Sequence, residues 1–124
     1  PFIFEKEGEA GFRVREAKVI DDLSNLDGIV LATGGGAIIN DESRSLLGAR
    51  GFVVYLKTGI EQQLVRTRRG RERPLLANDD PRGSLVALMA AREPLYLEIA
   101  DLTVETDGRK VHAVTTDILE AIQG

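Results

Sequence analysis

A short apolar run that leads into three consecutive glycines restricts the fold of this chain more than any other feature. Residues 29–33 read Ile-Val-Leu-Ala-Thr, and the next three are Gly34, Gly35 and Gly36. Because the run does not alternate with polar residues, it predicts a strand covered on both faces, as strands of parallel sheets are. The glycines allow positive φ angles and close approach of backbone N–H groups to a ligand oxygen. They indicate either a binding turn at the carboxyl end of the strand or a plain flexible connection.

Strand-like and helix-like stretches alternate along the chain, which is typical of a parallel α/β sheet. Further strands are expected over 52–56 and 102–106. Helices are expected over about 9–26, from Asn40 or Asp41 through Arg50, after residue 58, over about 84–91, around 94–100 and over about 111–122. Asp27-Gly28 and Gly51 should end the first two helices, and Asp107-Gly108 should turn the chain into the last one. Thr58 and Glu61 have the spacing of a capping box.

Composition excludes several classes of function. The chain has 124 residues, of which 43% are hydrophobic and 29% charged, as expected for one soluble domain. The absence of cysteine and the single histidine exclude thiolate and imidazole-rich metal sites. A net charge of −4 argues against a nucleic-acid partner. No apolar run is long enough to span a bilayer and no signal segment opens the chain, so we expect a cytoplasmic protein with no membrane partner.

Positive charge is concentrated in one segment of this acidic chain. Five of the sixteen Lys and Arg residues fall within 66–73, RTRRGRER. Such a run is often only a solvated face. The embedded Gly70 and the Arg73-Pro74 junction favour a loop that swings over a small anionic ligand and delivers a guanidinium to a phosphoryl group.

Two isolated arginines are candidate ligands for a carboxylate. Arg13 and Glu16 lie one helical turn apart, so the carboxylate can fix the orientation of the guanidinium, or the two can form a plain surface ion pair. Arg92 precedes Glu93-Pro94. Its planar guanidinium suits a bidentate clamp on a carboxylate, although an arginine near a helix end can also interact only with the helix dipole.

Four motifs occur in an order and spacing that resemble the shikimate kinase family: FRVRE at 12–16, TGGG at 33–36, RPLL at 73–76 and AREPLYLEIAD at 91–101. The resemblance runs from Glu7 to at least Thr106. It implies an α/β, parallel-sheet P-loop NTPase fold of the nucleoside-monophosphate-kinase type, in three α/β/α layers. Residues 1–124 would form one partial domain, with a substrate-binding helix over about 9–26 and a mobile lid over about 66–83. The family uses ATP and Mg²⁺ to phosphorylate the 3-hydroxyl of shikimate in aromatic amino-acid biosynthesis.

The resemblance also assigns roles to particular residues. It implies that Arg13 and Arg92 bind the carboxylate of shikimate and that Glu16 orients Arg13. The glycine turn would form the wall of the pocket. Gly35 would contact the substrate, and Gly34 and Gly36 would shape the turn. Three arginines would contact ATP. Arg73 would act catalytically from the lid on the phosphates, Arg66 would lie beside the nucleotide, and Arg109 would contact the adenine. A monomer is expected.

The chain departs from the family pattern at its front. The pattern GxxxxGK[ST] occurs nowhere in the 124 residues, so we expect the first βα unit and the second strand of the fold to be missing, together with the magnesium ligands. A fragment of this kind is expected neither to fold well nor to turn over ATP alone. Two alternatives remain: a gluconate-kinase-like enzyme with another acceptor, and a non-catalytic shikimate-kinase-like binding protein.

Overall fold

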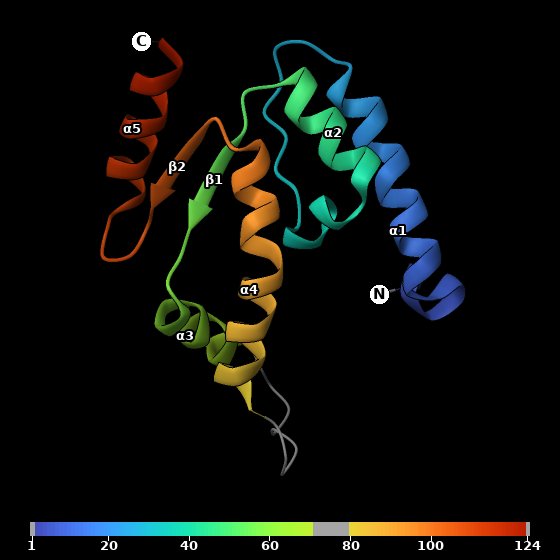
Figure 1. Ribbon diagram of the computed structural model, residues 1–124, viewed down its shortest axis with the longest axis horizontal. Coiled ribbons are helices and arrows are strands. Elements are labelled where there is room, and N and C mark those ends of the chain that lie inside the picture. The colour runs from blue at the N-terminus through green and yellow to red at the C-terminus, as the bar shows by residue number, and fades with distance from the viewer. Residues whose placement is uncertain (1, 71–79, 124) are drawn as a thin grey trace. The chain divides into compact units, whose positions relative to one another are not determined.

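The computed structural model describes residues 2–70 and 80–123, which belong to two compact units, Pro1–Val53 and Val54–Gly124 (Figure 1). The N-terminal unit contains α1 (Phe2–Ser24), the 3₁₀ helix η1 (Gly35–Ile39) and α2 (Asp41–Arg50). The C-terminal unit contains β1 (Val54–Lys57), α3 (Ile60–Gly70), α4 (Pro81–Ile99), β2 (Leu102–Glu105) and α5 (Val111–Gln123). No helix in the described ranges has the length and apolar character that crossing a bilayer requires.

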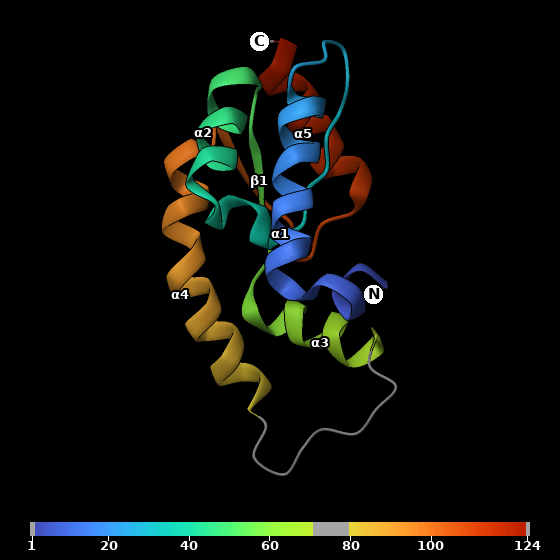
Figure 2. The same ribbon diagram turned by 90° about the vertical axis from the view of Figure 1, so that its right-hand side faces the viewer.

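A two-stranded parallel sheet organises the C-terminal unit. β1 pairs with β2 in the register Val54 opposite Leu102 through Lys57 opposite Glu105. The strands expected over 52–56 and 102–106 are therefore confirmed, the first displaced by about two residues. Helices α4 and α5 lie on either side of this small sheet, which gives three layers within the unit (Figures 1 and 2). Among the described residues of this unit, the buried side chains are Tyr55, Leu64 and Val104.

The N-terminal unit packs α1 against α2 and η1. Its core consists of Ile20, Ala37, Ile38 and the fully buried Ser43. Helix α2 has the predicted boundaries: the side-chain oxygen of Asn40 accepts a hydrogen bond from the Ser43 N–H at 2.9 Å, and Gly51 follows the last helical residue. Asparagine at this position satisfies one of the unpaired N–H groups at the start of the helix.

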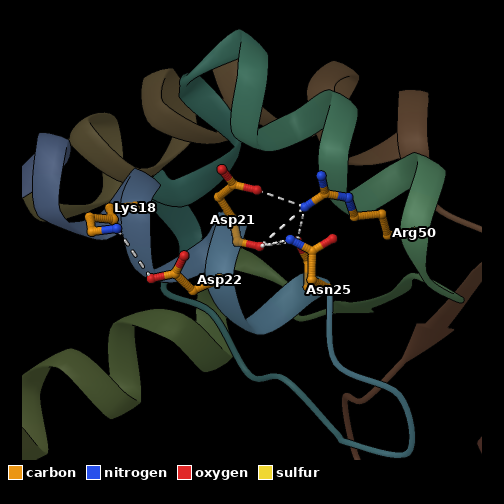
Figure 3. Close-up of polar contacts among 6 residues, drawn as sticks. Lys18, Asp21, Asp22, Asn25 and Arg50 are labelled. Atoms are coloured by element: carbon orange, nitrogen blue, oxygen red, sulfur yellow. Dashed lines mark hydrogen bonds and ion pairs between the residues drawn. The ribbon is translucent and has the colours of Figure 1, made fainter.

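A polar cluster joins the ends of α1 and α2 (Figure 3). Nη1 of Arg50 donates to Oδ1 of Asp21 at 2.8 Å, to the Asp21 carbonyl at 3.1 Å and to Oγ of Ser24 at 2.9 Å. Asn25 donates to the same carbonyl, and Lys18 pairs with Asp22 one turn away. Arg50 thus supplies donors to the carbonyl end of α1, which the helix itself leaves unsatisfied.

The strand expected over residues 29–33 is not formed, and this prediction is wrong. In the described part of the chain, ladder hydrogen bonds join only β1 and β2, and residues 29–33 connect α1 to η1. Val30 is 99% exposed and Ile29 is 45% exposed. A parallel strand exists only where a neighbouring strand supplies its hydrogen bonds, so an apolar run cannot form one alone.

Several smaller expectations about helix boundaries are also corrected. α1 begins at Phe2 and bends at Gly8, where φ is 74°. The two helices expected over 84–91 and 94–100 are one helix, α4, which continues through Pro94. The predicted capping box is replaced by contacts with the segment after β2. Thr58 Oγ1 lies 2.8 Å from Thr106 Oγ1, and the carboxylate of Asp107 accepts the Gly59 N–H. Tertiary partners override the local capping signal here.

Glycine conformation matches the sequence at two of the expected turns. Gly28, after α1, has φ of 72°, and Gly108, before α5, has φ of 68°, so both adopt the left-handed region in which glycine is favoured. The glycine triplet behaves differently from expectation. Among the described residues, positive φ occurs only at Gly8, Gly28 and Gly108.

Candidate functional site

The glycine triplet makes room for an arginine side chain. If Gly36 carried a Cβ, that atom would stand 2.6 Å from Nη2 and 2.9 Å from Nη1 of Arg13. Real Cβ atoms essentially never stand so close to another atom, so one of the two groups would have to move. A Cβ at residue 36 would therefore displace the flexible end of the Arg13 side chain, and glycine lets the guanidinium lie directly against the main chain. The structure brings together two residues that the sequence singled out separately.

The guanidinium of Arg13 is oriented from its own helix. Nη1 donates to Oε1 of Glu16 at 2.7 Å, so the ion pair predicted from their spacing is present. Cζ also lies 5.4 Å from the centre of the Phe12 ring, a cation–π arrangement. A guanidinium carries five N–H donors in a planar fork, so Arg13 can keep its contact with Glu16 and bind a ligand carboxylate at the same time.

Arg44 holds the glycine turn in place, and sequence reasoning missed it. Its side chain is only 14% exposed; Nη1 donates to the carbonyl of Ile38 at 2.8 Å and Nη2 to Oδ1 of Asp41 at 2.9 Å. The turn is closed by a hydrogen bond from the Ala37 N–H to the Gly34 carbonyl at 3.2 Å. The Asp41–Arg44 spacing was a local signal for the ion pair, but the bond to Ile38 depends on how η1 and α2 pack.

Arg92 lies on α4 in the C-terminal unit. Its Nε–H is buried and has no hydrogen-bond partner among the described residues. Leaving such a donor unpaired costs about 1–3 kcal/mol, so each case in a folded protein requires an explanation. A ligand that accepts hydrogen bonds is one such explanation, and it agrees with the carboxylate clamp that the sequence predicts for this residue.

A second group missed by sequence reasoning lies beside Arg92 on the same helix. The hydroxyl of Tyr55 on β1 donates to Oε2 of Glu93 at 2.8 Å, and Nζ of Lys57 lies 3.7 Å from the same oxygen. Burial, and then the hydrogen bond to Glu93, raise the pKa of the Tyr55 phenol well above its ordinary value. Tyr55 therefore stays protonated as a donor. No sequence signal links residues 38 positions apart.

The residues expected to contact the nucleotide are only partly described. Arg66 is exposed on α3. Arg109, after β2, bonds to Asp117 at 2.7 Å and to the carbonyl oxygens of Glu105 and Ala113 at 3.3 Å each. An open groove beside β2 contains Arg109 together with three acidic residues, Glu105, Asp117 and Glu120. The net negative charge of this groove would repel phosphate groups but not an uncharged base.

Other expected features of the nucleotide site lie elsewhere. Arg73, and the middle half of the lid expected over 66–83, lie outside the described residues, whereas its two ends belong to α3 and α4. Within the ranges 2–70 and 80–123, no group of three or more His, Cys, Asp and Glu side chains could hold a metal ion. The described side chains therefore do not form a magnesium site.

Comparison with known proteins places the chain among the small-molecule kinases with a P-loop NTPase-like fold, and the parallel α/β fold and the oriented guanidinium beside a glycine turn agree with that class. The family follows from sequence comparison, since a family model described as "Shikimate kinase" matches residues 1–123. The chain belongs to the shikimate kinase family.

Individual relatives agree with this assignment. The shikimate kinase of Halorhodospira halophila is 56% identical over 124 residues, which are 100% of this chain and 70% of that protein. The shikimate kinase of Pseudomonas entomophila is 57% identical over 99% of this chain and 72% of its own length. The solved structure of Acinetobacter baumannii shikimate kinase in complex with shikimate is 47% identical, with a TM-score of 0.87 over 99% of this chain and 69% of that one. The predicted family and kinase function are confirmed, and the gluconate-kinase-like alternative loses its support.

Proposed function

We propose that Arg13 and Arg92 each bind the carboxylate of shikimate while this kinase transfers the terminal phosphoryl group of ATP to the 3-hydroxyl. The observation that carries the proposal is the contact between Arg13 and Gly36. A Cβ at residue 36 would displace the guanidinium, so the missing side chain is what lets Arg13 lie against the glycine turn. Glu16 fixes that guanidinium, and the Acinetobacter relative, which is solved with shikimate bound, shares 47% of its sequence with this chain.

The glycine turn is proposed as the wall of the substrate pocket. Gly35 would contact shikimate, and its neighbours Gly34 and Gly36 would set the path of the backbone. Support comes from the short 3₁₀ helix that begins at Gly35, because its residues 36–38 are buried and Arg44 donates a hydrogen bond to its Ile38 carbonyl. A rigid wall of this kind positions a reacting hydroxyl at low entropic cost.

ATP is proposed as the phosphoryl donor, with Arg66, Arg73 and Arg109 on the nucleotide side. Arg73 would act catalytically by placing positive charge on the transferring group, since phosphoryl transfer depends mainly on positioning and charge stabilisation. Arg109 is already held by Asp117 and backbone carbonyls, which suits a planar contact with the adenine better than a phosphate clamp. Mg²⁺ is proposed as the usual partner of ATP in this family.

The finer features of the fold are also proposed. We infer that the complete family fold adds a first βα unit with the P-loop and a second strand, and that residues 66–83 form the lid. Support comes from the exposed apolar run at residues 29–33, which has the composition of a buried strand. A monomer in the cytoplasm is the proposed state of the protein.

Titration calorimetry with shikimate tests the carboxylate assignment in a chimera that joins this chain to the part of the Halorhodospira relative that it does not match. Arg13→Lys and Arg92→Lys should each weaken binding by roughly tenfold or more, because lysine keeps the charge but loses the fork. Arg15→Lys makes the same chemical change at an exposed position on the same helix and should bind normally. The methyl ester of shikimate should bind poorly to the unmodified protein. Equal affinity for the acid and its ester would reject the assignment.

The reaction is tested by joining this chain to the part of the Halorhodospira relative that it does not match. The chimera should release ADP in a shikimate-dependent manner, and gluconate should not replace shikimate. ADP release that is equal with gluconate would show that the acceptor is assigned wrongly.

A further inference from the structure

We propose that Tyr55 and Glu93 are positioning residues, which set the turn of α4 that carries Arg92 so that its guanidinium meets the substrate carboxylate. The inference rests on the proposed role of Arg92. Neither Tyr55 nor Glu93 needs to touch the ligand for this role.

The contact joins β1 to one face of α4. Oη of Tyr55 donates to Oε2 of Glu93 at 2.8 Å, and Nζ of Lys57 approaches the same oxygen at 3.7 Å. The rings of Tyr55 and Tyr96 have their centres 4.8 Å apart. Because Glu93 and Tyr96 are three residues apart, they lie on the same helical face. Tyr55, which is 9% exposed, therefore holds two successive points of α4.

The helix needs this support at one place. Pro94 lies inside α4, immediately after Glu93. Proline has no N–H, so the carbonyl of Ala90 loses its helical donor, and the proline ring crowds that carbonyl. The turn between residues 90 and 94 is thereby weakened, and Arg92 is in its middle. Its direction depends on tertiary contacts on both sides of the proline, which are Glu93 before it and Tyr96 after it.

The direction of the Arg92 guanidinium depends on small changes in that turn of α4. Its Nε–H is buried without a partner among the described residues, so the base of the guanidinium is confined before any ligand arrives. Neighbouring residues on a helix point about 100° apart, so a rotation of Glu93 about the helix axis carries Arg92 with it. A bidentate bond to a carboxylate requires both N–H groups to meet their oxygens together. Loss of the Tyr55 hydroxyl should therefore weaken ligand binding without removing a ligand contact.

The experiment uses the chimera with the Halorhodospira relative and measures its binding of shikimate by calorimetry, together with the Nε–H signals of arginine in NMR spectra. Tyr55→Phe keeps the ring and its packing on Tyr96 but removes the hydrogen bond, and it should weaken binding roughly tenfold. Glu93→Gln keeps an acceptor for the hydroxyl and should lose less affinity than Glu93→Ala. The Nε–H signal of Arg92, identified by its absence in Arg92→Lys, should shift on adding shikimate and should shift less in Tyr55→Phe.

A matched control separates positioning from general stability. Thr116→Val also removes one hydroxyl hydrogen bond, to the His112 carbonyl on α5, and should leave affinity unchanged. If Tyr55→Phe and Glu93→Ala bind shikimate as tightly as the unmodified chimera while Arg92→Lys binds weakly, the positioning role is wrong and the proposed function stands. If Arg92→Lys binds normally, the proposed role of Arg92 fails, and the inference fails with it.

Discussion

The carboxylate of Asp107 accepts the backbone N–H of Gly59 with both oxygens, each at 3.0 Å. The bond joins the segment after β2 to the first turn of α3. Because these segments follow two paired parallel strands, Asp107 fixes the end of the sheet at which ligands bind in such folds. An aspartate from a distant part of the sequence therefore caps α3, where the local pattern had indicated Thr58 and Glu61.

Removing this cap should destabilise the protein. Asp107→Ala is expected to lower the free energy of unfolding by about 1 kcal/mol, the usual cost of losing an N-terminal cap. Asp107→Asn keeps an oxygen acceptor and should lose less. Urea denaturation of the two variants measures the difference, and an Asp107→Ala variant as stable as the unmodified protein would contradict the capping role.

Adding one methyl group at Gly36 should displace Arg13. Gly36→Ala places a Cβ 2.6 Å from the position of Nη2, so we expect the guanidinium to move away at little cost in stability, with at least a tenfold loss of shikimate affinity, in line with the loss of a charged bidentate contact. Gly51→Ala is the control, since its Cβ would meet only the Leu47 carbonyl at 3.9 Å. Adding Arg13→Ala to the Gly36→Ala variant should lower the affinity little further, because the guanidinium is already displaced. A large loss of stability in Gly36→Ala would show that another contact makes Gly36 necessary.

Arg44 should determine how rigid the glycine turn is. Arg44→Met keeps the aliphatic stem but removes the donor to the Ile38 carbonyl, which should cost about 1–3 kcal/mol. The Ala37 N–H, which closes the turn on Gly34, should then exchange faster with deuterium. Lys18→Met breaks only an exposed ion pair with Asp22 and should change stability by no more than about 0.5 kcal/mol. Unchanged exchange at Ala37 in Arg44→Met would exclude a bracing role.

The raised pKa of Tyr55 predicts a specific loss of stability in alkali. In the unfolded chain the phenol ionises near its ordinary pKa of 10.0, whereas the folded protein keeps the proton to higher pH. The native state then binds more protons than the unfolded state, so the stabilisation is complete below pH 10.0 and falls as the pH rises further, by roughly 1 kcal/mol per pH unit. Denaturation of the unmodified protein and Tyr55→Phe at pH 8 and pH 11, chosen about one to two units either side of that pKa, should show their stability difference shrinking. A constant difference would contradict the assignment.

Sequence reasoning succeeded where a local signal sufficed. Asn40 and Gly51 mark the limits of α2, and the spacing of Arg13 and Glu16 gave their ion pair, because each depends on residues within one or two turns. Strand pairing failed at residues 29–33 because a ladder depends on a partner elsewhere in the chain.

The contacts that complete the candidate site were not predictable for the same reason. Gly36 was singled out for conformational freedom, yet it matters through its closeness to Arg13, which lies on another helix. The bond between Tyr55 and Glu93 spans 38 residues. Pro94 looked like the boundary between two helices, and packing of Tyr96 against Tyr55 helps to carry α4 through it.

The exposed run at residues 29–33 has a consequence for handling the protein. Short segments rich in Ile, Val and Leu without charge or proline are the ones that stack into intermolecular sheets when they lie open to solvent. With Val30 almost fully accessible, this connection is where self-association in concentrated solution should begin. Because this strand-forming sequence does not form a strand, it should make the chain prone to aggregation.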